Sequence, residues 1–157
     1  MVIGVISDTH GLLRPEALEA LNGSKHIIHA GDVGDPAILD ELREIAPVTA
    51  VRGNVDHGAW AKKIPETELV EIGGVSIYVV HILEKLDLKP EAAGIRAVIY
   101  GHSHVPKLET KNGVLYFNPG SAGPKRFHLP ITVGRLMVEN GTVGAEIIEI
   151  QYPAKIR

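Results

Sequence analysis

Short apolar runs alternate with helical patterns in the first third of the chain. Strand-length runs at Val2–Ile6, His26–His29 and Val48–Val51 each end in polar or glycine residues. Between them, Pro15–Leu21 and Pro36–Ile45 are predicted helices, and each begins with the proline that a first helical turn favours. Strands that alternate with helices indicate right-handed crossovers and a parallel sheet.

The rest of the chain is mostly β in pattern. Gly73-Gly74 and Asn140-Gly141 separate pairs of apolar runs, and both dipeptides are hairpin signals. The charged segment Glu84–Gly94 predicts one or two short helices. The remaining predicted strands are Glu68–Ile72, Val75–His81, Ala97–Tyr100, Val114–Phe117, Thr132–Val138 and Val143–Ile150. We therefore expect an α/β fold in which two mixed β-sheets pack as a sandwich flanked by α-helices.

Length and composition narrow the class of protein. The 157 residues fit one domain over residues 1–157, and 45% hydrophobic residues is a globular value. The absence of cysteine excludes a disulfide scaffold, an iron–sulfur cluster and a thiol nucleophile. No apolar run reaches membrane-spanning length and the N-terminus lacks a basic leader, so the sequence predicts a cytoplasmic protein. The net charge of −3 disfavours nucleic acid as a partner.

Polar residues follow the predicted strands at the points where the apolar runs end. They are Asp8, His10, Asp32, Asn54, Asp56, His81, His102 and His104. Because ligands bind at the carboxyl ends of strands in open α/β sheets, these side chains are expected to meet in one pocket. Carboxylate, imidazole and amide oxygen suit divalent ions such as Mn, Fe, Co, Ni and Zn. Without sulfur donors, an open catalytic site fits better than a closed structural one.

Each motif also has a structural interpretation. Asp8 and Asp32 could form turns, and His81 could be a hydrogen-bonded histidine of the core. Gly101-His102-Ser103-His104 is the strongest single motif, because two imidazoles at a strand end have little use in packing. The ordered set favours a metal site.

The set resembles the calcineurin-like metallophosphoesterase superfamily, whose five motifs occur here in the family order. The motifs are Asp8-x-His10, Gly31-Asp32, Gly53-Asn54-x-Asp56, His81 and Gly101-His102-Ser103-His104. The short length and the turn Asn118-Pro119-Gly120-Ser121 look like the small bacterial and archaeal phosphodiesterase branch, which includes a eukaryotic retromer subunit with the same fold. The resemblance implies a first metal on Asp8, His10 and His104. It implies a second metal on Asn54, His81 and His102, with Asp32 bridging the two.

The resemblance also implies a reaction, in which a metal-bridging hydroxide attacks phosphorus in line. Two divalent ions are expected, manganese first, with nickel, iron, cobalt or zinc as alternatives. Asn54, Asp56 and His102 are the candidate catalytic residues. The Asn54 amide can donate to a phosphate oxygen, and Asp56 is expected to accept a hydrogen bond from a ligand imidazole.

Two departures from the family pattern bear on turnover. Val55 stands where many members have the histidine that protonates the leaving group, and Ile82-Leu83 replaces the usual glycine after His81. Esters with good leaving groups should therefore react faster than alkyl esters.

The expected function is hydrolysis of a small phosphodiester substrate. The alternatives are a phosphomonoesterase or nuclease of the same family, or a non-catalytic protein-binding scaffold. No membrane partner is expected, and the oligomeric state stays open, with a homo-oligomer as one option.

Overall fold

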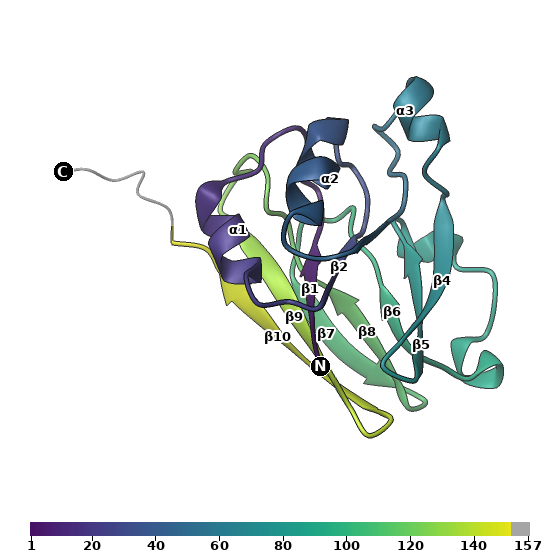
Figure 1. The fold of residues 1–157 in the computed structure, drawn as a ribbon. Helices are drawn as coiled ribbons and strands as arrows, with labels where there is room; N and C mark the ends of the chain where they lie inside the picture. Colours follow the sequence, from purple (N-terminus) through teal and green to yellow (C-terminus); the bar gives the residue numbers. More distant parts are fainter. Residues whose placement is uncertain (152–157) are drawn as a thin grey trace.

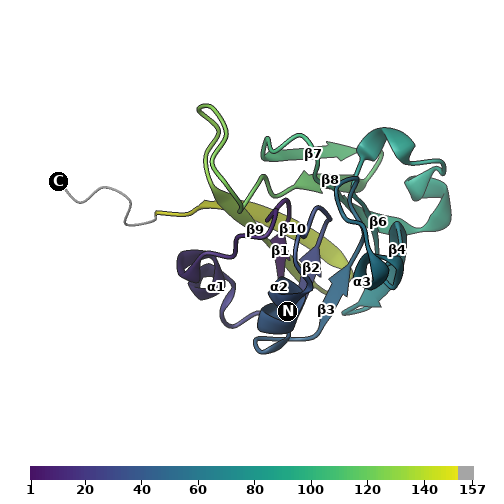
Figure 2. The same cartoon turned by 90° about the horizontal axis from the view of Figure 1, so that it is seen from above.

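Two five-stranded β-sheets face each other, and the two longer helices cover the outer side of one of them (Figures 1 and 2). The structure is a computed structural model that describes residues 1–151. It confirms the predicted α/β sandwich of two mixed sheets. The single-domain prediction for residues 1–157 includes 152–157, which lie outside the described residues.

The first sheet has the order β10-β9-β1-β2-β3. Its strands are β1 (Val2–Ile6), β2 (His26–His29), β3 (Val48–Ala50), β9 (Thr132–Glu139) and β10 (Thr142–Glu149). The three N-terminal strands are parallel because α1 (Pro15–Leu21) and α2 (Pro36–Arg43) connect them as crossovers. Strands β9 and β10 form the predicted hairpin, and β9 pairs antiparallel with β1.

The second sheet has the order β4-β5-β6-β8-β7. Its strands are β4 (Thr67–Ile72), β5 (Val75–Val80), β6 (Ile95–Ile99), β7 (Lys107–Lys111) and β8 (Val114–Asn118). The predicted hairpin at Gly73-Gly74 joins β4 to β5, and β5, β6 and β8 run parallel. Two short 3-10 helices, η1 (Leu83–Lys85) and η2 (Pro90–Ala93), fall where the sequence predicts short helices.

Two elements were not predicted. Strand β7 carries the sequence Lys-Leu-Glu-Thr-Lys and is mostly exposed, so it lacks the apolar run that marks a strand. It forms because it pairs with β8 at the sheet edge, where charged residues discourage pairing with other chains. The one-turn helix α3 (Ala59–Lys62) lies in a segment without helical periodicity, and α2 ends at Arg43 rather than Ile45.

The main hydrophobic core fills the space between the sheets. Ile3 and Val5 of β1 lie in one cluster with Ile77 of β5, Ile99 of β6 and Phe117 of β8, all fully buried. A second cluster packs α1 and α2 against the outer face of the first sheet. Each such aliphatic side chain stabilises the fold by about 1.5–3 kcal/mol, so the strand ends are held in fixed positions. None of the helices within residues 1–151 is long and apolar enough to cross a membrane.

Candidate metal centre

The predicted ligands meet at one edge of the sandwich, although they come from both sheets. Asp8 and His10 follow β1 and Asp32 follows β2 in the first sheet, whereas His81 follows β5 in the second. Backbone hydrogen bonds join the loops, with Asp8 N–H donating to Gly31 (3.0 Å) and Gly101 N–H donating to His81 (3.0 Å). Residues far apart in the sequence therefore share one site.

One group of donor atoms consists of Asp8, His10 and His104. Their ligand atoms all lie within 4.8 Å of one another. Asp8 Oδ1 lies 3.4 Å from His104 Nε2 and 3.7 Å from His10 Nε2, and the two imidazole Nε2 atoms lie 3.3 Å apart. This is the set that the resemblance assigned to the first metal.

A second group consists of Asp32, His81 and His102, whose ligand atoms also lie within 4.8 Å. His81 Nε2 is 3.1 Å from Asp32 Oδ2, and the His81 and His102 ring centroids are 5.3 Å apart. Asn54 is exposed and lines the same cavity as His81. The geometry therefore groups three residues of the second predicted set and places Asn54 beside them.

The two groups are contiguous. Asp32 Oδ2, which faces His81, also lies 3.6 Å from His10 Nε2 of the first group. In the other direction, Asp8 Oδ1 lies 3.8 Å from His81 Nε2. The Asp32 carboxylate thus stands between the groups, as a bridging ligand requires.

Three buried atoms at this edge have no hydrogen-bond partner among the described residues. They are Asp8 Oδ1, His81 Nε2 and His104 Nδ1. A buried polar atom without a partner is costly, by about 1–3 kcal/mol, and native proteins rarely keep one without a role. Asp8 Oδ1 and His81 Nε2 lie 3.8 Å apart, and a carboxylate oxygen beside an imidazole nitrogen fits borderline divalent cations. The residues present therefore fit the metal ions that the resemblance implies.

Hydrogen bonds fix which atom of each ligand faces the site. Asp8 Oδ2 accepts from Ser7 Oγ (2.7 Å) and from the His102 N–H (3.1 Å), which leaves Oδ1 facing the imidazoles. Asp32 Oδ1 accepts the Val55 N–H (3.0 Å), which leaves Oδ2. His81 Nδ1 lies 2.7 Å from the Ala30 carbonyl oxygen, so Nδ1 donates and Nε2 presents its lone pair.

The ligand backbones adopt a conformation that side chains normally avoid. Five predicted ligands have φ between 47° and 77°: Asp8, His10, Asp32, His102 and His104. Such left-handed residues cost about 1–3 kcal/mol each and collect at functional sites. The surrounding backbone hydrogen bonds hold these turns in place.

Glycines permit the loops to approach one another. A Cβ on Gly53 would lie 2.1 Å from Asp32 Oδ1, and a Cβ on Gly31 would lie 2.6 Å from His81 Nδ1. Real side chains do not tolerate these distances. Positions 31 and 53, directly before Asp32 and Asn54, therefore require glycine for steric reasons.

The site changes the protonation of its own ligands. Burial opposes ionisation of Asp8, but the His10 and His104 imidazoles outweigh it and hold the pKa of Asp8 well below its usual range. Burial likewise opposes ionisation of Asp32, yet His81 and the Val55 N–H lower the pKa of Asp32. Both carboxylates are therefore ionised at neutral pH, the form that binds cations.

Asp56 does not have the role expected from the sequence. Its carboxylate accepts three backbone N–H groups, those of Val33 (3.1 Å), Gly34 (2.9 Å) and Gly53 (2.9 Å). The expected hydrogen bond from a ligand imidazole is absent among the described residues, where the hydrogen-bond partners of the Asp56 carboxylate are these three backbone groups. Asp56 instead ties the loop that carries Asp32 to the loop that carries Asn54.

Several supporting residues were missed or left as structural possibilities. Ser7 binds Asp8 directly, and Ser121 Oγ donates to the Asp8 carbonyl oxygen (3.0 Å). Asn118 Nδ2 donates to Gly101 (3.1 Å) and to Ser103 Oγ (3.2 Å), which supports the loop of His102 and His104. In the sequence, these supporting residues are indicated only by the short polar segments Ser7–His10 and Asn118–Ser121.

The two departures from the family pattern have visible consequences. Val55 is 40% exposed beside Asn54 and supplies only its backbone to the site. His57 Nδ1 lies 2.8 Å from the Val55 carbonyl oxygen, so this histidine is engaged by the loop itself. Ile82 has an extended backbone (φ −110°), which differs from the positive φ that glycine permits there.

Comparisons with known proteins agree with this geometry. Residues 1–141 match the model of the calcineurin-like phosphoesterase superfamily domain. A probable metallophosphoesterase of Methanocaldococcus jannaschii is 36% identical over 164 residues, covering 96% of this chain and 82% of the relative.

Among solved structures, a novel archaeal phosphodiesterase has a TM-score of 0.77 and 27% identity, covering 94% of this chain and all of that one. Chaetomium thermophilum Vps29 has a TM-score of 0.74 at 21% identity, covering 98% of this chain and all of that one, and this likeness shows the fold alone. The match of the family model and the identity to the Methanocaldococcus relative together show that this chain belongs to the calcineurin-like phosphoesterase superfamily.

Proposed function

We propose that this protein is a metal-dependent phosphodiesterase that hydrolyses a small phosphodiester by in-line attack of water. The observation that carries the proposal is the pair of contiguous donor groups, in which the buried atom Asp8 Oδ1 lacks a hydrogen-bond partner within residues 1–151 and His81 Nε2 faces the Asp32 carboxylate at 3.1 Å. The solved archaeal relative described as a phosphodiesterase supports this choice of substrate over a monoester.

Seven residues would hold the two ions. Asp8, His10 and His104 would hold one ion, His81 and His102 with the neighbouring Asn54 would hold the other, and Asp32, which lies between the groups, would contact both. Manganese is the first candidate, with nickel, iron, cobalt and zinc as alternatives, because the donors are mixed nitrogen and oxygen. Bound ions supply Lewis acidity, which activates water and neutralises charge on the phosphate.

The protein's own groups orient the ester. Asn54 is exposed at the site, so its amide oxygen can act as a ligand while its NH₂ donates to a phosphate oxygen. His102 is the exposed member of its donor group and is the imidazole that an entering phosphate meets first. Asp56 contributes indirectly, since it fixes the Gly53 backbone next to Asn54.

Leaving-group preference follows from Val55. Its side chain cannot donate a proton, so departure of the alcohol depends on the alcohol's own acidity. We expect aryl diesters to react at least about tenfold faster than alkyl diesters. Equal rates for the two kinds of ester would refute this part of the proposal.

The central test is an assay of an aryl phosphodiester and the matching monoester with added Mn²⁺ or Ni²⁺. Wild type should hydrolyse the diester faster than the monoester. The variants Asp32→Ala and Asn54→Ala should each hydrolyse the diester at least about a hundredfold more slowly than wild type. Asp40→Ala is the control, because this exposed carboxylate lies on α2 outside the site. A wild type that binds metal but hydrolyses neither ester would instead favour the scaffold alternative.

A further inference from the structure

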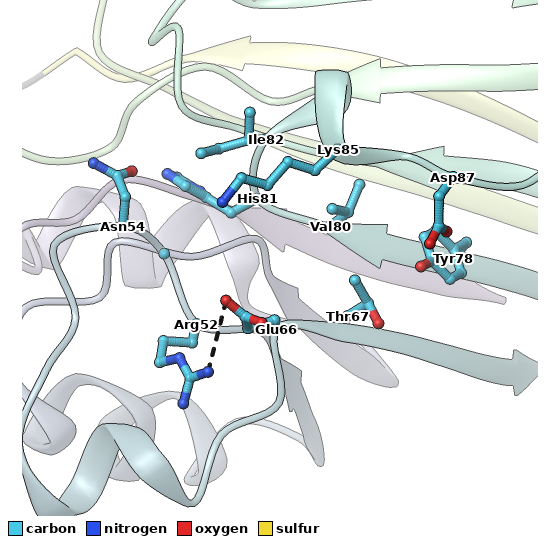
Figure 3. Close-up of a pocket in the computed structure, with 11 residues that line it drawn as sticks. Arg52, Asn54, Glu66, Thr67, Tyr78, Val80, His81, Ile82, Lys85 and Asp87 are labelled. Atoms are coloured by element: carbon cyan, nitrogen blue, oxygen red, sulfur yellow. Dashed lines mark ion pairs between the residues drawn. The ribbon is translucent and has the colours of Figure 1, made fainter.

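A cavity of about 290 Å³ opens beside the Asn54 and His81 side of the metal centre (Figure 3). Its floor is buried and includes Tyr78, Val80 and His81. Its rim is exposed and charged, and it includes Lys85 and Asp87. The cavity therefore shares a wall with the site at which the phosphate is expected to bind.

The end of the cavity nearest His81 carries a positive charge that has no ion-pair partner among the described residues. Lys85 lies at the end of η1, and Figure 3 shows its side chain extending toward His81. Among the described residues no carboxylate lies within 4.0 Å of its ammonium group, whereas Arg52 in the same cavity pairs with Glu66 at 3.7 Å. A cation that points toward a site for divalent ions is repelled unless an anion lies between them. A phosphate oxygen is the anion that the proposed reaction would place there.

The end of the cavity away from Asn54 carries a negative charge, that of Asp87. Asp87, Tyr78 and Thr67 lie together at the end away from Asn54 (Figure 3). A carboxylate and two hydroxyls can accept from and donate to the hydroxyl groups of an alcohol. The Asp87 charge repels an alcohol that carries a second phosphate. The charges of Arg52 and Glu66 offset each other, so Lys85 and Asp87 set the polarity of the cavity.

The volume limits the size of the occupant. At roughly 30 Å³ per water molecule the cavity holds about ten waters, the space of a glycerol or a single sugar rather than a nucleic acid strand. An ester arm of that size would lie on the buried floor beside the charged rim, with one side open to solvent.

We infer that this cavity is the binding site for one ester arm of the substrate, and that it selects an uncharged, hydroxyl-bearing alcohol over one carrying a second phosphate. The inference rests on the proposed function and names the substrate class of that site. Lys85 binds the reacting phosphate group, and Asp87 with Thr67 and Tyr78 binds the hydroxyls of the arm. The substrate is then a phosphodiester of a small polyol or sugar.

Calorimetric titration of the Mn²⁺-loaded protein with two non-hydrolysable phosphonate analogues tests the inference. One analogue carries a glyceryl arm and the other a phosphoglyceryl arm. Wild type should bind the glyceryl analogue at least about tenfold more tightly. Asp87→Lys should remove or reverse this preference, and Lys85→Met should lower the binding affinity for both analogues by about tenfold.

Two neighbouring exposed residues supply matched controls. Glu91→Lys makes the same charge change as Asp87→Lys, and Lys89→Met the same as Lys85→Met, but neither residue lines the cavity. Both control variants should keep the wild-type affinities within about twofold. If wild type binds both analogues equally, or if the controls match the cavity variants, the inference is overturned.

Hydrolysis of the corresponding phosphodiesters separates this inference from the proposed function. Hydrolysis without a preference for the arm overturns the cavity assignment and leaves the phosphodiesterase proposal standing. Arm-selective binding without hydrolysis of any diester overturns the phosphodiesterase proposal and supports the cavity assignment.

Discussion

His29 Nε2 lies 3.0 Å from Oγ1 of Thr9, directly beneath the two loops that carry Asp8 and Asp32. The other ring nitrogen of His29 accepts the Gly31 N–H at 3.1 Å, so Nε2 carries the proton and donates it to Thr9. The Thr9 hydroxyl in turn donates to the Val33 carbonyl oxygen at 2.8 Å. A fully buried, neutral histidine is therefore hydrogen-bonded to both of the loops that carry ligands.

Acid should weaken the fold through His29. Burial lowers the pKa of His29 from 6.5 to about 4. Between these values the unfolded chain binds a proton that the folded chain excludes, so the free energy of unfolding falls as the pH drops through this range. The loss from this residue is about 3 kcal/mol at most. Urea unfolding with chelator at pH 7 and pH 4.5 measures it, and His29→Gln should show the smaller pH dependence. Equal pH dependence in both proteins would contradict the assignment.

Removing the Asp56 charge should destabilise the protein. In Asp56→Asn the amide replaces one acceptor oxygen with a donor that faces the backbone N–H of Val33, Gly34 or Gly53. We expect a loss of about 2–3 kcal/mol in the free energy of unfolding. Asp40→Asn is the control, because the Asp40 side chain is 77% exposed, and it should change stability by less than about 0.5 kcal/mol. A similar, small effect in both variants would show that the three hydrogen bonds contribute little.

A methyl group at Gly53 should disrupt the site locally. The new Cβ would lie 2.1 Å from Asp32 Oδ1 and 2.2 Å from its backbone nitrogen, so Gly53→Ala must displace the proposed bridging carboxylate. We expect at least about tenfold weaker metal binding and a loss of stability of about 1–3 kcal/mol. Gly144→Ala in β10 has nothing within 4 Å of its Cβ and should leave metal binding unchanged. Wild-type metal affinity in Gly53→Ala would refute the steric argument.

Metal binding should stabilise the protein in a pH-dependent way. Burial opposes protonation of His81, but the Asp32 and Asp8 carboxylates outweigh it and raise the pKa of His81 above 6.5. Protons therefore compete with metal as the pH falls toward and below neutrality, and binding releases a proton. At a free Mn²⁺ concentration 100 times Kd, the gain in unfolding free energy is about 2.7 kcal/mol.

Thermal unfolding with and without Mn²⁺, at pH 6 and pH 8, measures this linkage. The stabilisation should be larger at pH 8, because more of the His81 population is then neutral. His81→Ala should lose most of the stabilisation by Mn²⁺. The control His128→Ala changes an exposed loop residue and should keep the full stabilisation. A metal effect that is the same at both pH values would contradict the role of His81.

The ligand positions at the strand ends were predictable because residues that can bind metal directly follow the apolar runs that predict strands. Asp8, Asp32 and His102 each follow an apolar run, and parallel strands bring such positions to one edge. Strand β7 was not predictable, because its charged residues form a strand only through pairing with β8. Its existence depends on a neighbour rather than on its own sequence.

The supporting contacts were harder to predict than the ligands. Asp56 binds backbone groups 22 and 23 residues earlier in the chain, and nothing in the sequence shows that those N–H groups point toward it. Lys85 belongs to an exposed charged segment whose composition suggests only a solvated surface. The extended backbone at Ile82 and the turn of η1 are what direct it back toward His81.

The origin of the ligands in two different sheets has a mechanical consequence. The chain has no cysteine, so nothing covalent besides the backbone joins the half that contributes His10 to the half that contributes His104, 94 residues later. An ion held by both would be a reversible crosslink between the sheets, and it would stabilise the folded protein to the extent that it binds the folded state more tightly than the unfolded chain. Without the ion, hydrogen bonds such as those of the His102 N–H to Asp8 Oδ2 and of His81 Nδ1 to the Ala30 carbonyl oxygen would remain the links at this end, while the core holds the sheets together elsewhere.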